Sequence, residues 1–308
     1  MGATCFAGTT SRWTSTPGST SAAAATRASC GWPSSTRTAI SVRTTNTSRS
    51  PGSVAVTRRL ALAATLLLAA IGCASVARPA GPVLSPAATM REAGMVAIRT
   101  VVPDIDQDIR YFGSDNFVGT RVDGYLAPHC WLKREAAEAL ARVERRLRES
   151  HQRLRIFDCY RPTRAVAHFM RWANDPADLA TKARHYPDFD KPQLLDGYIA
   201  PVSGHSRGAT VDLTLLQCDA DDAACRAVDM GTDFDFFGTR ANTDSAEVTA
   251  LQRRNRDRLR AAMAAEGFRN YPMEWWHFTL QLEPTPGLLY DIPVDAPEPT
   301  KPDAATGP

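Results

Sequence analysis

Apolar residues recur with helical spacing in three segments of the chain. These segments are residues 133–150, 163–173 and 251–266, and each is predicted to be a helix with one apolar face. Thr163 follows a proline and is the expected N-cap of the second helix, whereas Gly267 ends the third. In the first helix the apolar positions recur every three or four residues: Ala136, Leu140, Val143 and Leu147.

Three further segments alternate between apolar and polar residues, which is typical of half-buried strands. They are residues 153–157, 209–216 and 275–282, of which the last is expected to be the final strand. In the middle segment Asp212 and Thr214 point to the face opposite the apolar side chains. Helices and strands do not alternate regularly, so we expect an α+β fold with a small antiparallel sheet flanked by helices.

The beginning of the chain has a different composition. Residues 1–53 are rich in Thr, Ser, Ala, Arg and Gly and lack an apolar period, so we expect a disordered leader, or a stretch that precedes the true start of translation. Residues 54–73 have the architecture of a signal peptide: two arginines, an apolar run too short to span a bilayer, and small residues before Cys73. We therefore expect export, with Cys73 as the lipidated first residue of the mature protein.

Two further segments bound the folded unit. Residues 74–90 are rich in Ala, Pro and Ser and are expected to form a linker. Residues 294–308 are rich in proline and acidic residues and are expected to form a disordered tail. The folded unit is thus expected over residues 91–293.

Charge and cysteine content narrow the class of protein. The net charge is +3, and many arginines lie in the leader, which holds almost no acidic residue, so there is no electrostatic case for a nucleic-acid partner. The expected folded unit holds an even number of cysteines, which suggests two disulfides in an exported protein and free thiols or metal ligands in a cytosolic one. These cysteines are Cys130, Cys159, Cys218 and Cys225.

Two short segments carry candidate catalytic chemistry. His205 lies in a turn rich in Gly and Ser, Asp212 lies on the polar side of the next strand, and Glu274 and His277 lie close together further along the chain. Two nitrogen ligands and one carboxylate oxygen are typical of a catalytic zinc site with one open position. We therefore predict one zinc ion on the sheet, held by His205, Asp212 and His277. Glu274 would be the general base, which takes a proton from the attacking water and passes it to the leaving amine.

Each segment alone has a simpler interpretation. A histidine or an aspartate in a strand is more often satisfied by packing and hydrogen bonds than by a metal ion. Taken together, the two segments supply three ligands and one base for a single site, so we favour the metal site.

From about Asp104 to Pro293 the chain resembles the zinc D-alanyl-D-alanine dipeptidases, the family that includes the vancomycin-resistance dipeptidase. The resemblance rests on a series of motifs in order along the chain. These motifs are Asp115-Asn116-Phe117, Val122-Asp123-Gly124-Tyr125, Asp158-Cys159-Tyr160-Arg161-Pro162, His205-Ser206-Arg207-Gly208, Asp212-Leu213-Thr214-Leu215, Phe234-Asp235-Phe236 and Glu274-Trp275-Trp276-His277.

The resemblance implies the same zinc ligands and base, and it adds roles for other residues. It implies that Arg161 stabilises the charged tetrahedral intermediate, as a cation aimed at a developing oxyanion can. It also implies that Tyr111, Ser203 and Asp235 line the substrate pocket, with Asp235 holding the free amino terminus of a dipeptide. Without the resemblance, Arg161 would be interpreted as a structural ion pair and Asp235 as part of a solvated acidic loop. The family often has a serine where this chain has Gly204.

The positions of the four cysteines favour two bridges over free buried thiols. Cys218 and Cys225 bracket a short acidic loop. Cys130 precedes the first predicted helix and Cys159 follows the next strand, so a bridge between them would staple this helix to the strand that leads to Arg161.

The sequence thus predicts an exported zinc enzyme, with one zinc ion per subunit, that hydrolyses D-Ala-D-Ala to two D-alanines. In the periplasm, with a lipid anchor as its membrane contact, it would meet dipeptide released from peptidoglycan. The alternatives are a zinc D,D-carboxypeptidase that acts on peptidoglycan stem peptides and a non-catalytic lipoprotein that binds the cell wall. Asp235 argues against the first because capture of a free amine beside the scissile bond excludes longer peptides. Glu274 argues against the second because a binding protein needs no base.

The mature protein is expected to begin at a lipid-modified Cys73. Mass spectrometry of the N-terminal peptide of the exported protein measures this directly. An intact Met1 would contradict both export and lipidation.

Overall fold

The computed structural model of the protein describes residues 81–297. The expected leader and signal peptide, with Cys73, lie outside the described residues, as do residues 74–80 of the expected linker and residues 298–308 of the expected tail. Within residues 81–297 no helix is both long enough and apolar enough to cross a membrane.

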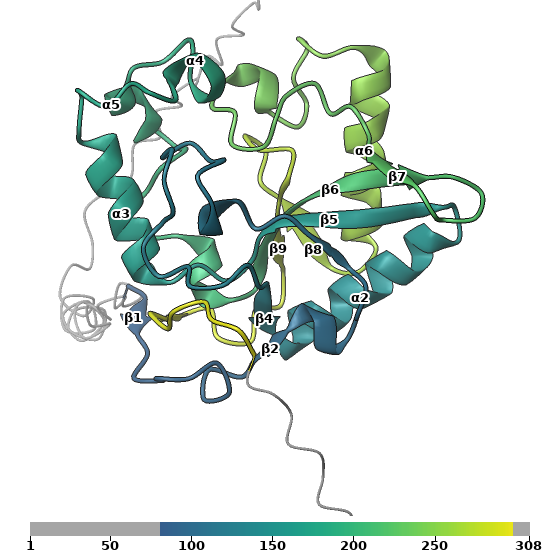
Figure 1. Ribbon diagram of the computed structural model, residues 1–308, viewed down its shortest axis with the longest axis horizontal. Coiled ribbons are helices and arrows are strands. Elements are labelled where there is room, and N and C mark those ends of the chain that lie inside the picture. Colours follow the sequence, from purple (N-terminus) through teal and green to yellow (C-terminus); the bar gives the residue numbers. More distant parts are fainter. Residues whose placement is uncertain (1–80, 298–308) are drawn as a thin grey trace, which may run out of the picture. The chain divides into compact units, whose positions relative to one another are not determined.

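A six-stranded sheet forms the centre of the fold (Figure 1). The strand order is β3-β5-β6-β9-β8, and β7 pairs with the far end of β6. All neighbouring strands are antiparallel except β3, which runs parallel to β5. The sheet is therefore mixed, whereas the sequence predicted an antiparallel one. The strands are β3 (Asp106–Gln107), β5 (Gln152–Asp158), β6 (Thr210–Cys218), β7 (Cys225–Ala227), β8 (Phe268–Asn270) and β9 (His277–Leu280).

Two small two-stranded sheets border the central one. In one of them β2 (Met95–Ala97) pairs with β4 (Trp131–Lys133) in antiparallel fashion. In the other, β1 (Val83–Leu84) pairs in parallel with β10 (Leu288–Leu289).

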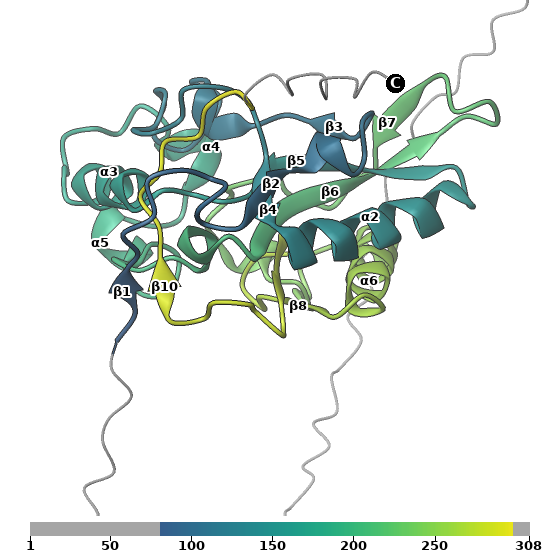
Figure 2. The ribbon, with the colours of Figure 1, turned by 90° about the horizontal axis from the view of Figure 1, so that it is seen from below.

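Two long helices, α2 (Arg134–Arg148) and α6 (Ala250–Ala264), lie on one face of the central sheet (Figure 2). The four apolar positions that predicted α2 are all buried, and this face packs on β5. The shorter helices lie beside the other end of the sheet, away from the β6–β7 hairpin (Figure 1). They are α3 (Thr163–Ala173), α4 (Lys182–His185) and α5 (Lys191–Leu194), and single 3-10 turns lie at η1 (Ile98–Thr100), η2 (Arg110–Phe112), η3 (Gly204–Arg207) and η4 (Thr239–Ala241).

Some sequence-based expectations are wrong in detail. Thr163 is not the N-cap of α3 but its first helical residue; Pro162 is the N-cap, with an extended backbone. The strand predicted over residues 275–282 is shorter, and it is not the last one, since β10 follows it. Short strands such as β10 escape a periodicity argument because two residues cannot show a period.

The ordered chain also extends beyond residues 91–293 at both ends. β1 lies in the segment expected to be a linker and is held by its hydrogen bonds to β10. Val294, in the expected tail, is fully buried, and its carbonyl oxygen accepts hydrogen bonds from the N–H groups of Leu126 and Ala127.

The register of the central sheet places two candidate ligands and a further aspartate in one row. Asp158 at the end of β5 pairs with Asp212 in β6, and Asp212 pairs in turn with His277 at the start of β9. A register shift between Ile156 and Asp158 accompanies the pairing with β6. Such an irregularity re-aims the side chains that follow it, and here it puts Asp158 beside Asp212.

Both expected disulfides are present. Cys130–Cys159 ties the segment before α2 to the end of β5, and Cys218–Cys225 closes the hairpin between β6 and β7. The first bridge therefore lies next to the row of candidate site residues, whereas the second lies at the far end of β6.

Loss of the first bridge should cost more stability than loss of the second. In the loop-entropy account, paired Cys→Ser changes should lower the free energy of unfolding by about 3 to 4 kcal/mol for Cys130 with Cys159 and by about 2 kcal/mol for Cys218 with Cys225, because the sequence separations are 29 and 7. Urea denaturation of the two double variants measures both values. Equal losses would contradict the expected order.

Candidate active site

Three side chains from distant parts of the sequence converge at one end of the sheet. The Nε2 atom of His205 lies 3.2 Å from Oδ2 of Asp212 and 3.3 Å from Nδ1 of His277. The same Nδ1 atom lies 3.2 Å from Oδ1 of Asp212. The structure thus brings together all three predicted ligands.

These distances fit the coordination of zinc. A tetrahedral zinc ion with bonds of about 2.0–2.1 Å needs ligand atoms roughly 3.3 Å apart. The buried Oδ1 atom of Asp212 has no hydrogen-bond partner among the described residues, although Nδ1 of His277 lies 3.2 Å away. An orphaned buried carboxylate oxygen is costly, so a cation between these groups would satisfy the site.

The charge state of the cluster follows from its burial and its histidines. Burial alone would raise the pKa of Asp212, but the adjoining His205 and His277 lower the pKa of this carboxyl well below its usual range. Burial would likewise lower the pKa of His277, but its contacts with Asp212 and Glu274 outweigh this and raise the pKa to about 9.

A tight turn aims His205 at the site. The Oγ atom of Ser203 accepts a hydrogen bond from the His205 N–H and caps the turn η3. Gly208 closes the turn with φ +79°, where a Cβ atom would lie only 2.6 Å from the Met95 side chain. The His205 Nδ1–H donates to the carbonyl oxygen of Cys159 at 2.6 Å, which leaves Nε2 free to act as a ligand.

Glu274 lies beside the ligand cluster. Its Oε2 atom is 3.3 Å from Nδ1 of His277, and the residue is largely buried. The short turn before β9 places it there, because its N–H donates to the carbonyl oxygen of Tyr271. A carboxylate next to the open side of a metal site is positioned to move a proton.

A buried ion pair fixes Arg161. Its Nε and Nη2 atoms donate to Oδ2 of Asp158 at 2.9 and 2.8 Å, and its Nη2 lies 3.5 Å from Oδ2 of Asp212. The guanidinium lies beside the adjoining rings of Tyr111 and Phe169, each centred 5.0 Å from it. Arg161 is therefore both an ion-pair partner and a cation at the site, so the two interpretations of the sequence are compatible.

Asp235 is a buried carboxylate and not part of a solvated loop, since it is only 4% exposed. The hydroxyl group of Tyr111 donates to its two oxygens, at 3.0 and 3.1 Å. Burial, followed by the charge of Asp212, raises the pKa of Asp235 well above its usual range. A cationic group bound beside Asp235 would offset this cost of burying its charge.

One pocket joins these groups. It has a volume of about 270 Å³, at the small end of ligand sites, which span about 300–1,000 Å³. Aromatic side chains form much of its wall. Every predicted catalytic, metal-binding and substrate-binding residue lines it: Tyr111, Arg161, Ser203, His205, Asp212, Asp235, Glu274 and His277.

Residues 91–295 match the family described as D-ala-D-ala dipeptidase. The chain belongs to this family. It is 42% identical over 195 residues to a D-alanyl-D-alanine dipeptidase of Streptomyces coelicolor, covering 63% of this chain and 95% of that protein. It is 37% identical to a D-alanyl-D-alanine dipeptidase of Enterococcus faecium, over 66% of this chain and 99% of that protein. It is 32% identical to one of Escherichia coli, over 64% of this chain and 90% of that protein. Members of this dipeptidase family are zinc enzymes, which agrees with the cluster of two histidines and one aspartate.

Gly204 is the position at which this member of the dipeptidase family departs from the usual serine. Although Gly204 borders the pocket, a Cβ atom there would lie 3.1 Å from Thr210 Oγ1 and 3.3 Å from Arg207 Nη2. A side chain at this position would therefore point toward these two residues.

Sequence reasoning missed two residues that hold this dipeptidase site in place. Asp158 was noted only as part of a motif, yet it is fully buried and accepts hydrogen bonds from Arg161 and, at 2.6 Å, from the hydroxyl group of Tyr125. His185, to which the sequence assigned no role, is buried, and its Nδ1 lies 3.0 Å from the Asp235 carbonyl oxygen. For Asp158 the sequence offered one signal: it lies three residues before Arg161, a spacing at which an acidic and a basic side chain can pair.

Zinc binding should release a proton at neutral pH. Without metal, His277 has a pKa of about 9 and is protonated at pH 7, whereas a zinc ligand must be the neutral imidazole. The apparent zinc affinity should therefore rise about tenfold per pH unit up to about pH 9. Titration calorimetry in buffers of different ionisation enthalpy measures the proton count. Zinc uptake at pH 7 without proton release would contradict this assignment.

Proposed function

We propose that the protein is a zinc-dependent dipeptidase that hydrolyses D-Ala-D-Ala to two D-alanines, with one zinc ion per subunit. The observation that supports this best is the convergence of a metal-ligand cluster, a carboxylate base, a buried guanidinium and a buried carboxylate on one small pocket. The curated relatives named above are all described as D-alanyl-D-alanine dipeptidases.

His205, Asp212 and His277 would hold the zinc ion, which supplies Lewis acidity where negative charge develops on oxygen. Glu274 takes a proton from the attacking water and delivers it to the nitrogen of the leaving D-alanine. Arg161 needs no rearrangement to assist, because Asp158, which is itself held by the hydroxyl group of Tyr125, already fixes its guanidinium group. A preorganised cation of this kind stabilises the oxyanion of the tetrahedral intermediate.

The substrate's ammonium group pairs with Asp235. Because Asp235 is only 4% exposed, a peptide that continued beyond this amine would have to enter the protein interior. The pocket therefore favours a free dipeptide over a peptidoglycan stem peptide. Tyr111 keeps its proton, since burial followed by the nearby Asp235 raises its pKa well above the usual range, and it orients Asp235 through hydrogen bonds. Ser203 borders the same pocket and would donate a hydrogen bond to the substrate.

Export completes the proposal. The signal-like segment over residues 54–73 supports secretion to the periplasm, with a lipid on Cys73 as the membrane anchor. The two disulfides are compatible with an oxidising compartment. There the enzyme would take part in the turnover of cell-wall peptides or in resistance to antibiotics that target them.

An assay series tests this function. The mature protein is offered D-Ala-D-Ala, L-Ala-L-Ala and a wall pentapeptide, with zinc and with a chelator. Rapid zinc-dependent cleavage of D-Ala-D-Ala alone is expected. Cleavage of the pentapeptide alone would indicate a D,D-carboxypeptidase instead, and no cleavage of any of the three would indicate a binding protein.

Glu274→Ala should lower kcat by about 10²- to 10⁴-fold, because the proton would lose its carrier. Bound zinc, measured by atomic absorption, should stay at one ion per subunit, because Glu274 is not a ligand. Glu138→Gln is the control, since Glu138 lies exposed on α2 and should leave kcat unchanged. Loss of zinc from Glu274→Ala would mean that Glu274 is a ligand and not the base.

A further inference from the structure

The loop that carries Asp235 connects β7 to α6 and is held at both ends by one buried arginine. We propose that Arg256 of α6 is a positioning residue that sets the place of Asp235, and thereby the selectivity of the pocket for a free amine. This inference rests on the proposed role of Asp235 as the anchor of the substrate's ammonium group.

The contacts of Arg256 are unusual for a buried cation. The residue is only 1% exposed, and no described carboxylate lies within ion-pair distance of it. Instead its Nε donates to the carbonyl oxygen of Met230 and its Nη1 to that of Asn242, both at 2.7 Å. Burial, with a smaller effect of Arg253, lowers its pKa to about 10, so it stays charged at neutral pH. Burying a cation is costly, and here the two carbonyl groups offset that cost.

These two carbonyl groups mark the ends of the Asp235 loop. Residues 231–241 lie between them, and a second residue joins the same ends. The indole Nε1–H of Trp275 donates to Oγ1 of Thr232 at 2.8 Å, and its backbone N–H donates to the carbonyl oxygen of Ala241 at 3.1 Å. Trp275 follows the base Glu274 directly, so the loop is tied to the catalytic segment as well as to α6.

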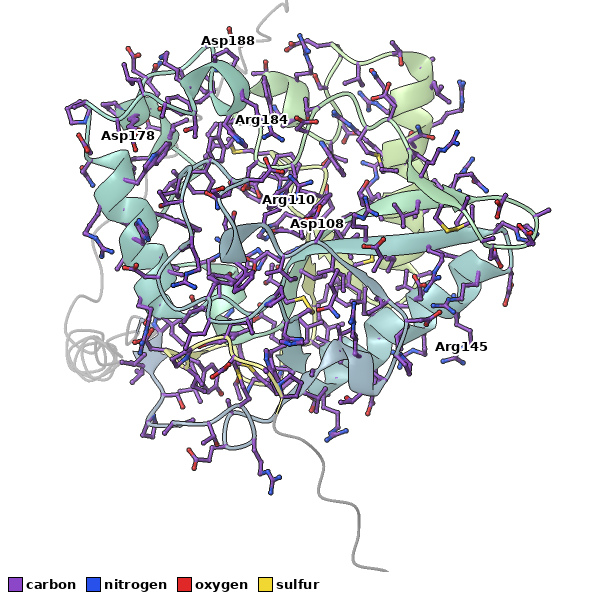
Figure 3. The ribbon with its side chains drawn as sticks, viewed as in Figure 1. Asp108, Arg110, Arg145, Asp178, Arg184 and Asp188 are labelled. Carbon is purple, nitrogen blue, oxygen red and sulfur yellow. A yellow bond between two sulfur atoms is a disulfide. The ribbon has the colours of Figure 1, made fainter. Side chains whose placement is uncertain are left out.

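The middle of the loop is held from the opposite side. Figure 1 shows the loop between α4 and α6. From α4, the ring of His185 binds the carbonyl oxygen of Asp235 through Nδ1 at 3.0 Å. The backbone carbonyl oxygen of His185 accepts a hydrogen bond from the N–H of Phe237 at 2.7 Å. Arg184 of α4 and Arg110 of η2, which lie near one another in Figure 3, both pair with Asp115. This ion-pair network joins α4 to the turn that carries Tyr111.

Asp235 needs this external support because its own backbone conformation is unfavourable. Its φ of +58° lies in the left-handed region, which residues other than glycine avoid. Its carboxylate is also buried. A loop released at its ends would relax this conformation and move the carboxylate away from the amine.

Arg256 does not line the pocket, so it acts only through the loop. An arginine suits this role because its planar group carries two fixed donors that can reach two carbonyl groups at once. A lysine has a similar length and the same charge but concentrates its donors on one atom. Loss of the clamp should therefore weaken binding of the amine while the metal cluster on the sheet stays intact.

The test compares Arg256→Lys with Arg260→Lys, a control on the same helix. Arg260 is partly exposed and pairs with Asp244 and Asp257. Two substrates are used: D-Ala-D-Ala and N-propionyl-D-alanine, which has hydrogen in place of the ammonium group. For Arg256→Lys we expect the KM for D-Ala-D-Ala to rise about tenfold, the equivalent of one charge-assisted hydrogen bond. We expect kcat per bound zinc, and kcat/KM for the analogue, to change by less than about twofold, well below that tenfold effect. The control should match the unchanged enzyme.

Thr232→Val provides a second, milder variant, because it removes the acceptor of the Trp275 indole and keeps the residue's shape. Its KM for D-Ala-D-Ala should rise about threefold, in line with the loss of a neutral hydrogen bond. If either variant folds, binds zinc and keeps the KM and the amine selectivity of the unchanged enzyme, the proposal is overturned. Equal loss of activity on both substrates, together with loss of zinc, would also overturn it, because Arg256 would then be purely structural. Failure of the unchanged enzyme to cleave D-Ala-D-Ala would instead refute the proposed function.

Discussion

The pairing of β6 with both β5 and β9 is the constraint on which the site depends. It sets Asp158, Asp212 and His277 side by side on three neighbouring strands. Because side chains alternate along a strand, a slip of one residue in either pairing would turn these groups to the opposite face. Hydrogen bonding within the sheet thus fixes two of the three metal-ligand positions. The third, His205, is fixed by its hydrogen bond to the Cys159 carbonyl oxygen at the end of β5.

The charge of the pocket explains what it is built to receive. Four carboxylates line the pocket or lie directly behind it: Asp158, Asp212, Asp235 and Glu274. Arg161 supplies the single guanidinium group that lines the pocket. Buried charges of one sign are tolerated only when ions or hydrogen bonds of the other sign offset them. Cations are therefore the natural occupants. A divalent metal ion would neutralise the end with the histidines, and an ammonium group would neutralise the end with Asp235.

The two ends of this pocket are built differently. At the end with the histidines, two of the three candidate ligands, Asp212 and His277, lie on paired strands of the central sheet, where strand pairing leaves little freedom. The Asp235 end lies on a loop, which is held in place by helices outside the sheet. In such an arrangement the candidate metal ligands keep their positions, while recognition of the substrate's amine depends on how the Asp235 loop is supported.

The sequence by itself determined much of this protein. Apolar periods located α2, α3 and α6 closely, because long amphipathic helices repeat their pattern many times. Residue chemistry selected the candidate metal ligands and the candidate base, and the structure brings these residues together in one pocket. The tertiary structure alone decided that the sheet is mixed, that β1 and β10 pair, and that Asp158, His185 and Arg256 support the site. Those features depend on contacts between distant segments, such as the bonds from Arg256 to two carbonyl oxygens, and backbone carbonyl groups carry no signal in a sequence.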